Sequence, residues 1–194
     1  MTTGDDSNGY DALAQEFLTS RERSTIGAST VARWAATLAP GSSVIDLGCG
    51  PGVPITQALI EAGHDIFAID ASASMVRAFM ERFPQVPVAC EAIQHSTFFN
   101  RTFDGAVAWG VMFLLRADLQ ELVIQRVARA LKPGGRFLFT APWQTCTWTD
   151  LLTGRESVSL GREAYLPVLS SAGFTLLKEF DDEGENHYYD VVLS

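Results

Sequence analysis

Short apolar runs alternate with stretches of helical periodicity along the chain from about Gly41 onward. Runs of about four to eight apolar residues bounded by turn residues are typical of buried strands, and apolar residues three and four positions apart are typical of a helix with one buried face. This alternation predicts a mostly parallel sheet covered by helices on both faces. The predicted strands are residues 43–47, 64–69, 86–90, 103–109, 136–141, 174–180 and 188–193.

Helices are expected between these strands and before the first of them. The predicted helices cover residues 12–18, 30–38, 55–62, 72–83, 118–131 and 162–172. Ser72 is a typical N-cap residue, and Gly63 and Gly173 are typical C-terminal stops. The two helices before Gly41 are expected to lie across the top of the sheet as a lid.

The link between the last two predicted strands, residues 181–186, has the composition of a loop and is too short for a helical crossover. A short link makes these two strands an antiparallel hairpin, so the last strand is reversed. The strand before the link runs parallel to the others, and its carboxyl end delivers the loop to the edge of the sheet where ligands bind in such folds.

The segment 44–52 reads V-I-D-L-G-C-G-P-G and joins a buried strand to a glycine turn and a helix. Such a turn lets the backbone approach a ligand closely, which makes it a candidate nucleotide site. The dinucleotide fingerprint G-x-G-x-x-G is not matched, because Gly48, Gly50 and Gly52 alternate and Val53 stands at the third glycine position. The preceding Asp46 would repel a pyrophosphate and attract an ammonium or sulfonium group.

This segment resembles motif I of the class I S-adenosylmethionine (SAM)-dependent methyltransferases, whose cofactor carries both of those positive groups. The resemblance extends from about Tyr10 to the C-terminus. It implies a Rossmann-like α/β fold of seven mostly parallel strands with the last one antiparallel, SAM as the cofactor and S-adenosylhomocysteine (SAH) as its product. The length of 194 residues favours one domain, with residues 1–40 as a helical lid and residues 41–194 as the core.

Asp70 is the clearest candidate beyond the glycine turn. It ends the second predicted strand 22 residues after Gly48, close to the offset of about 20 at which a carboxylate binds a ribose hydroxyl in nucleotide-binding α/β folds. We assign Asp70 to the ribose. The alternative is that it caps the following helix, but Ser72 is better placed for that role.

The resemblance places further residues around the cofactor. Glu91 stands where the family usually has an aspartate that contacts the adenine amino group. Its side chain is one methylene longer than that of aspartate, so a direct contact with the amino group does not follow from the resemblance. Met75 either packs on the adenine or belongs to the core. The expected cofactor-binding residues are Tyr10, Arg23, Asp46, Gly48, Cys49, Gly50, Asp70, Ala71, Met75, Glu91, Ala92, Ile93 and Trp109.

The N-terminal segment and the last loop offer two more candidates. Tyr10-Asp11-x-x-Ala14 resembles a lead-in that the family folds over the cofactor, and Arg21 or Arg23 is suited to pair with the methionine carboxylate; the alternative is that both arginines are surface residues. His187 or Glu185 could accept a proton from the methyl acceptor, or belong to a solvated acidic turn. Because methyl transfer depends chiefly on proximity and alignment, a catalytic side chain is not required.

The acceptor is expected to be a small molecule. The fourth strand lacks the N-P-P-Y or D-P-P-Y signature of amino-nitrogen methylases, no acidic metal site is recognisable, and no cysteine nucleophile follows Pro142. Trp109, Met112, Phe113 and Trp143 suggest an apolar, aromatic pocket mouth, or else ordinary core.

Composition limits the partners. The net charge of -9 disfavours nucleic acid and anionic membranes, and no targeting or membrane-spanning segment is recognisable. Cys49, Cys90 and Cys146 fit neither a disulfide framework nor a zinc site, which is typical of a cytoplasmic protein. No metal is expected. The segment 143–148 is apolar enough for a dimer surface, so a monomer and a homodimer both remain open.

Two other functions remain open. One is a SAM-binding module without turnover that regulates a partner. The other is a nicotinamide-dependent oxidoreductase, which Val53 and Asp46 disfavour.

Overall fold

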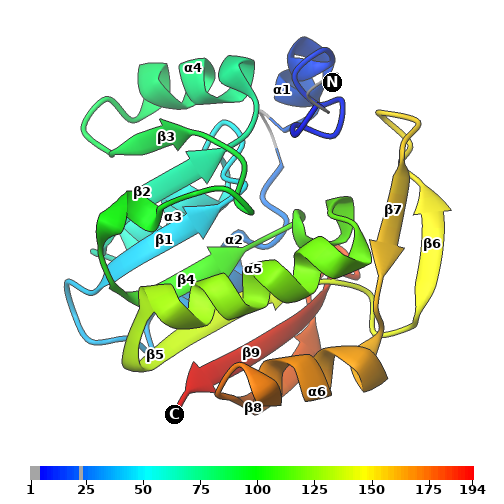
Figure 1. Cartoon of the computed structure of the whole chain (residues 1–194). Coiled ribbons are helices and arrows are strands. Elements are labelled where there is room, and N and C mark those ends of the chain that lie inside the picture. Colours follow the sequence, from blue (N-terminus) through cyan, green and yellow to red (C-terminus); the bar gives the residue numbers. More distant parts are fainter. Residues whose placement is uncertain (1–4, 22–23) are drawn as a thin grey trace.

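The computed structural model describes residues 5–21 and 24–194. A twisted central sheet is covered by helices on both faces, and a separate two-stranded hairpin stands beside it (Figure 1). Helices α5 (Ala117–Ala130) and α6 (Arg162–Ser171) lie in front of the sheet in this view, and α2 (Ala28–Ala35) and α3 (Ile55–Glu61) lie behind it. The α/β architecture expected from the sequence is confirmed.

The main sheet has seven strands in the order β3-β2-β1-β4-β5-β9-β8. Neighbouring strands from β3 to β5 pair in parallel, and β9 pairs antiparallel with both β5 and β8. The seven-stranded sheet with a reversed last strand is therefore confirmed. Its strands are β1 (Ser43–Leu47), β2 (Asp65–Asp70), β3 (Val88–Cys90), β4 (Phe103–Ala108), β5 (Leu131–Thr140), β8 (Phe174–Asp181) and β9 (His187–Leu193).

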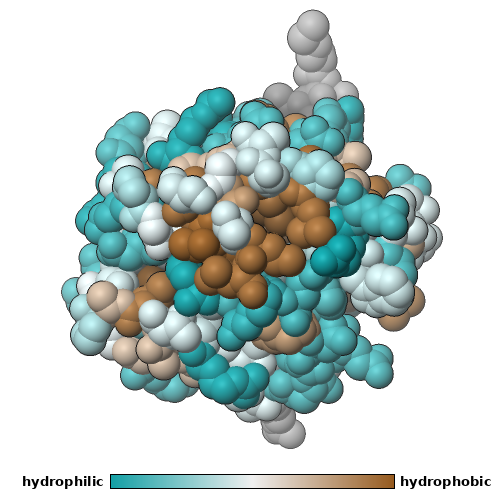
Figure 2. All heavy atoms as spheres, turned by 90° about the horizontal axis from the view of Figure 1, so that it is seen from below, coloured by the Kyte–Doolittle hydropathy of each residue, from teal (hydrophilic) through white to brown (hydrophobic). Residues whose placement is uncertain are grey.

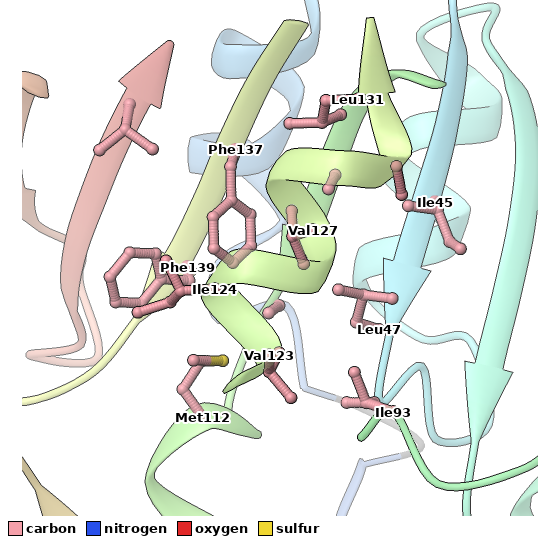
Figure 3. Close-up of a cluster of buried hydrophobic side chains, with 14 of the residues drawn as sticks. Ile45, Leu47, Ile93, Met112, Val123, Ile124, Val127, Leu131, Phe137 and Phe139 are labelled. Carbon is pink, nitrogen blue, oxygen red and sulfur yellow. The ribbon is translucent and has the colours of Figure 1, made fainter. Parts of the chain in front are cut away.

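The largest hydrophobic cluster lies between the sheet and its front helices. Helix α5 buries Val123, Ile124 and Val127, and these side chains face residues of β1 and β5, among them Leu47 and Phe137 (Figure 3). All five residues of β1 are buried because both faces of this central strand are covered. That double burial explains why the adjacent residues Val44 and Ile45, which face opposite sides of the sheet, are both apolar.

Helix α2 packs on the rear face of the sheet and not across its top, where it was expected as part of a lid. Val31 and Trp34 are buried against Val44 and Leu138. The Trp34 indole donates a hydrogen bond of 3.1 Å to the buried Asp190, which also pairs with the Arg136 guanidinium. Because one face of α2 is apolar and its tryptophan has a buried acceptor on β9, the helix is fixed to the sheet.

Helices α1 (Ala14–Arg21) and α4 (Ala73–Arg82) frame the edge of the sheet at which β1, β2 and β4 end (Figure 1). The hydroxyl of Ser72 accepts a hydrogen bond from the Met75 amide at 3.2 Å, which is the N-cap contact that the sequence predicts. Helix α4 also ends before Pro84, as expected.

A second sheet was not expected. Strands β6 (Cys146–Thr149) and β7 (Glu156–Ser159) form a hairpin between β5 and α6. Each strand has only four residues, too few for alternation to distinguish a strand from a loop. Two short 3-10 turns, η1 (Phe98–Asn100) and η2 (Met112–Leu114), were also missed.

The surface seen from below carries a large central apolar patch bordered mostly by polar side chains, together with smaller apolar areas (Figure 2). Within residues 5–21 and 24–194, every helix is too short or too polar to cross a bilayer.

Candidate active site

A cavity of about 780 Å³ opens where the carboxyl ends of β1, β2 and β4 meet. The chain leaves β1 toward β2 and β3 on one side and returns to β4 on the other, so the cavity lies at the switch point where open α/β sheets bind ligands. Its walls are the glycine turn, the ends of β2 and β4, residues 92–94, η2, the N-terminal segment and the turn of the β6–β7 hairpin.

The three alternating glycines of the turn have different roles, although all have positive φ. A Cβ atom on Gly48 would lie 2.6 Å from a methyl group of Val111, and one on Gly52 would lie 2.4 Å from the Phe83 ring. A Cβ atom on Gly50 would meet only the Phe17 ring, at 3.6 Å. Gly48 and Gly52 therefore allow close packing, whereas Gly50 leaves room on the side of the cavity.

Asp46 presents a buried carboxyl group to the cavity, with an exposed fraction of 1%. The Thr56 hydroxyl donates a hydrogen bond to it at 2.5 Å. Burial, with a smaller contribution from the nearby Asp70 charge, raises the pKa of Asp46 to about 7 against the lowering effect of the Thr56 hydrogen bond. Among residues 5–21 and 24–194, the groups that shift this pKa include no cation, so this part of the wall is complementary to a ligand that brings a positive charge.

Asp70 joins the glycine turn to the start of α4. One of its oxygens accepts a hydrogen bond from the Gly50 amide and the other from the Ser72 amide, both at 2.8 Å. Burial raises the pKa of Asp70, although the two amides act in the opposite direction. Each carboxylate oxygen keeps a lone pair that can accept from a hydroxyl group in the cavity.

The wall beyond β3 is apolar. Met75, Ala92 and Ile93 are buried and line the cavity. Glu91 is not among the lining residues, because its carboxylate accepts a hydrogen bond from the Ser96 hydroxyl at 2.6 Å. Gln94, which sequence reasoning missed, lines the cavity in its place and donates to Asp6 at 3.1 Å.

Trp109 lies just beyond β4 and lines the opposite wall. Its indole donates a hydrogen bond of 2.6 Å to the Tyr188 hydroxyl, which donates in turn to Asp182 at 2.8 Å. The Arg21 guanidinium lies 4.7 Å from the centre of the Trp109 ring and also lines the cavity. Arg23, the other arginine considered for the methionine carboxylate, lies outside the described residues.

The structure brings together most of the expected cofactor residues. Those that line the cavity are Tyr10, Asp46, Gly48, Cys49, Gly50, Asp70, Ala71, Met75, Ala92, Ile93 and Trp109. Of the aromatic mouth, Phe113 also lines it, but Met112 is core and Trp143 is exposed away from it.

His187 is not brought to the cavity. Its Nδ1 atom lies 2.7 Å from Asp181, its Nε2 atom lies 3.5 Å from Glu179, and its ring packs edge-on against Tyr189. Of the same hairpin loop, Asn186 lines the cavity and Glu185 does not. The expected role of His187 as a proton acceptor thus finds no geometric support, because the ring is held between two carboxylates of its own hairpin.

The N-terminal segment crosses the mouth of the cavity. Asp11 accepts hydrogen bonds from the Ser72 hydroxyl at 2.6 Å and the Ser74 amide at 2.9 Å, at the start of α4. On the other side, the Tyr10 hydroxyl donates to Asp150 in the β6–β7 turn at 3.0 Å. Burial raises the pKa of Tyr10 well above its usual range, with the Asp150 charge acting in the same direction.

No group of three or more His, Cys, Asp or Glu side chains in the described ranges, 5–21 and 24–194, is placed to hold a metal ion.

The glycine turn of the cavity lies in the part of the chain that matches a known family model. Residues 44–135 match the family model described as a methyltransferase domain. This match agrees with the resemblance of the glycine motif to that of the class I SAM-dependent methyltransferases.

Two curated relatives share the motif region. Over 102 residues the chain is 39% identical to a demethylmenaquinone methyltransferase of Corynebacterium urealyticum, a match that covers 51% of this chain and 41% of that protein. Over 114 residues it is 37% identical to a cypemycin N-terminal methyltransferase of a Streptomyces species, with coverages of 56% and 46%. The chain thus spans less than half the length of each.

Solved structures share the fold over almost the whole chain. A SAM-dependent methyltransferase from Clostridium acetobutylicum superposes with a TM-score of 0.73 at 17% identity, covering 95% of this chain and 99% of that one. The 1,6-didemethyltoxoflavin-N1-methyltransferase of Burkholderia thailandensis, solved with its acceptor and SAH bound, gives a TM-score of 0.72 at 19% identity, with coverages of 97% and 90%.

Proposed function

We propose that this protein transfers a methyl group from SAM to a small-molecule acceptor. The observation that carries this proposal is the buried carboxyl group of Asp46 in the wall of a cavity whose neighbouring turn is opened by Gly50. A buried carboxylate is costly unless a positive charge accompanies it. The ammonium group of SAM is such a charge, and a pyrophosphate is not.

The other walls fit the remaining parts of SAM. Asp70 has acceptor capacity for the ribose hydroxyls, and Met75 and Ile93 form an apolar slot for the adenine. Arg21 lines the cavity on the side of Phe17 and Gly50, where its guanidinium can pair with the methionine carboxylate. The sequence offered both Arg21 and Arg23 as partners of the methionine carboxylate, and we assign this contact to Arg21.

The side chains of the cavity act by holding the two reactants in line. When bound, SAM would supply the methyl group: its bond to sulfur would break with both electrons staying on sulfur, and a lone pair of the acceptor would form the new bond. Tyr10 has a raised pKa and Asp150 a lowered one, so neither takes up a proton near neutral pH. The proposal therefore assigns neither of them as a base: the acceptor enters in its nucleophilic form, and alignment supplies the rate.

A SAM-binding regulatory module without turnover is the alternative function. It would use the same SAM contacts, but it would need no space for an acceptor beside the methyl group. The aromatic half of the cavity, between Trp109 and the β6–β7 hairpin, favours turnover.

We also propose a cytoplasmic location and a surface for self-association. Cys49, Cys90 and Cys146 are free thiols, in keeping with a cytoplasmic protein. The apolar patch of Figure 2 is a candidate contact surface should the chain form the homodimer that its sequence leaves open.

Calorimetric titration with SAM, followed by measurement of SAH formation over a panel of amines, thiols, phenols and short peptides, tests the proposal. We expect SAM to bind and SAH to accumulate with at least one small-molecule acceptor. Turnover of peptides alone would contradict the acceptor class. Binding without turnover across the panel would support the regulatory module, and failure to bind SAM would contradict the proposal entirely.

A further inference from the structure

One half of the cavity lies beyond the residues that we propose to contact SAM, and aromatic and aliphatic side chains line it. Trp109 follows β4, Phe113 belongs to η2, and Trp148 lies on β6. The rings of Phe113 and Trp148 are in contact, with centres 5.3 Å apart and planes inclined by 49°. Leu151 and Leu152, in the turn of the hairpin, extend the apolar wall outward.

Phe113, Trp148 and Leu151 lie outside the clusters of buried hydrophobic residues, whereas Trp109 packs against one of these clusters. Trp109, Phe113 and Trp148 are only partly buried, and Leu151 is fully exposed although it lines the cavity. Apolar surface left in water next to a cavity is typical of a ligand site, because covering it is favourable only when a complementary apolar molecule binds.

The turn that carries Leu151 is built before any ligand arrives. The carboxylate of Asp150 accepts hydrogen bonds from the Leu152 amide at 3.0 Å and from the Thr153 amide at 2.8 Å. Asp150 is also bonded to Tyr10, and Arg155 forms an ion pair of 2.8 Å with Asp5. The hairpin is therefore tied to the N-terminal segment across the mouth of the cavity, so that its apolar residues are positioned in advance.

Building on the proposed function, we propose that the acceptor is a flat, largely apolar aromatic molecule and that the β6–β7 hairpin selects it. The acceptor packs against Phe113 and Trp148, with Trp109 beside it, and its outer end contacts Leu151. Flat rings fit this site because the wall is formed by rings, whose favourable contacts with an aromatic molecule are offset-stacked or edge-to-face. Trp148 and Leu151 are specificity-determining residues in this arrangement.

The neutral fluorophore 6-propionyl-2-(dimethylamino)naphthalene is a suitable probe, because its emission shifts when it leaves water for an apolar cavity. The probe is titrated into the 194-residue protein saturated with SAH. We expect saturable binding that weakens by about tenfold in Leu151→Asp and in Trp148→Ala, and by less than about twofold in Trp148→Phe, which keeps a ring. The matched control is Leu177→Asp, since Leu177 is also exposed but lies on β8 and outside the cavity lining.

Calorimetric titration of each variant with SAM separates this inference from the proposed function. Unchanged SAM affinity with weakened probe binding in Leu151→Asp and Trp148→Ala, but not in Leu177→Asp, supports the hairpin as the acceptor-selecting element. If all four variants bound the probe as tightly as the unmodified protein does, the inference would be overturned, and the proposed SAM-dependent transfer would be unaffected. Failure of the unmodified protein to bind SAM would instead refute the proposed function.

Discussion

Replacing Asp46 by asparagine removes one negative charge from the cavity wall and keeps both the shape of the side chain and an oxygen that accepts from Thr56. Burial raises the pKa of this carboxyl group from 3.8 to about 7. The folded chain therefore binds the proton more tightly than the unfolded chain. Its stability falls as pH rises from about 4 to about 7, and above that range the full cost of burying the charge is present.

The size of this cost follows from the same shift. Each pKa unit corresponds to about 1.4 kcal/mol, so three units correspond to about 4 kcal/mol. We expect Asp46→Asn to unfold at a higher temperature than the wild type at pH 8, and the difference to shrink toward zero near pH 4. Thermal unfolding at a series of pH values measures this. Asp65→Asn is the matched control, because it removes an exposed carboxylate from the start of β2.

The same substitution should weaken SAM binding. A charge-assisted hydrogen bond contributes about 1.5–3 kcal/mol, so the dissociation constant should rise by about 10- to 100-fold. In the wild type the affinity should fall as pH drops below about 7, because protonation of Asp46 competes with the ammonium group of SAM. In Asp46→Asn this dependence should disappear. A variant that is no more stable at pH 8 and binds SAM like the wild type would refute the reasoning.

Three other predictions address the turn, the ribose contact and the hairpin. Gly52→Ala should destabilise the fold by about 2 kcal/mol in urea unfolding, because its Cβ atom meets Phe83. Gly50→Ala should destabilise the fold by only about 1 kcal/mol and should chiefly weaken SAM binding. If both variants changed stability and SAM affinity to the same extent, the separate roles of the two glycines would be contradicted. Asp70→Ala should abolish most SAM binding in calorimetry while circular dichroism stays unchanged, and near-normal affinity would exclude the ribose assignment. His187→Gln should leave kcat within about twofold, since its ring contacts Asp181 and Glu179 outside the cavity; a large loss of kcat at unchanged KM would make it a proton acceptor after all.

The strands of the main sheet were predictable, although their order across it was not, because each strand of the parallel core carries its own apolar residues. The short loop before His187 was enough to predict the reversed strand, since no crossover fits into it. The position of α2 was not predictable. Trp34 is held by Asp190, which stands 156 residues later in the chain, and no local pattern contains that contact.

The candidate site was predictable where a residue lies at the carboxyl end of a parallel strand or directly after it. Asp46, Asp70 and Trp109 belong to this group, because the ends of parallel strands meet at one edge of the sheet. Gln94 and Asp150 were missed, since they lie in irregular segments whose direction depends on hydrogen bonds to the distant residues Asp6 and Tyr10. The exposed Leu151 in a threonine- and glycine-containing turn was a weak signal that could have been noticed.

Calorimetric titration with SAM at pH 6, in buffers of different ionisation enthalpy, tests most directly whether the cavity receives a positively charged ligand at Asp46. Because this carboxyl group is protonated in the free protein below about pH 7, pairing with the ammonium group should release close to one proton for each SAM bound. Binding whose heat is the same in every buffer, or no binding at all, would contradict the proposed contact.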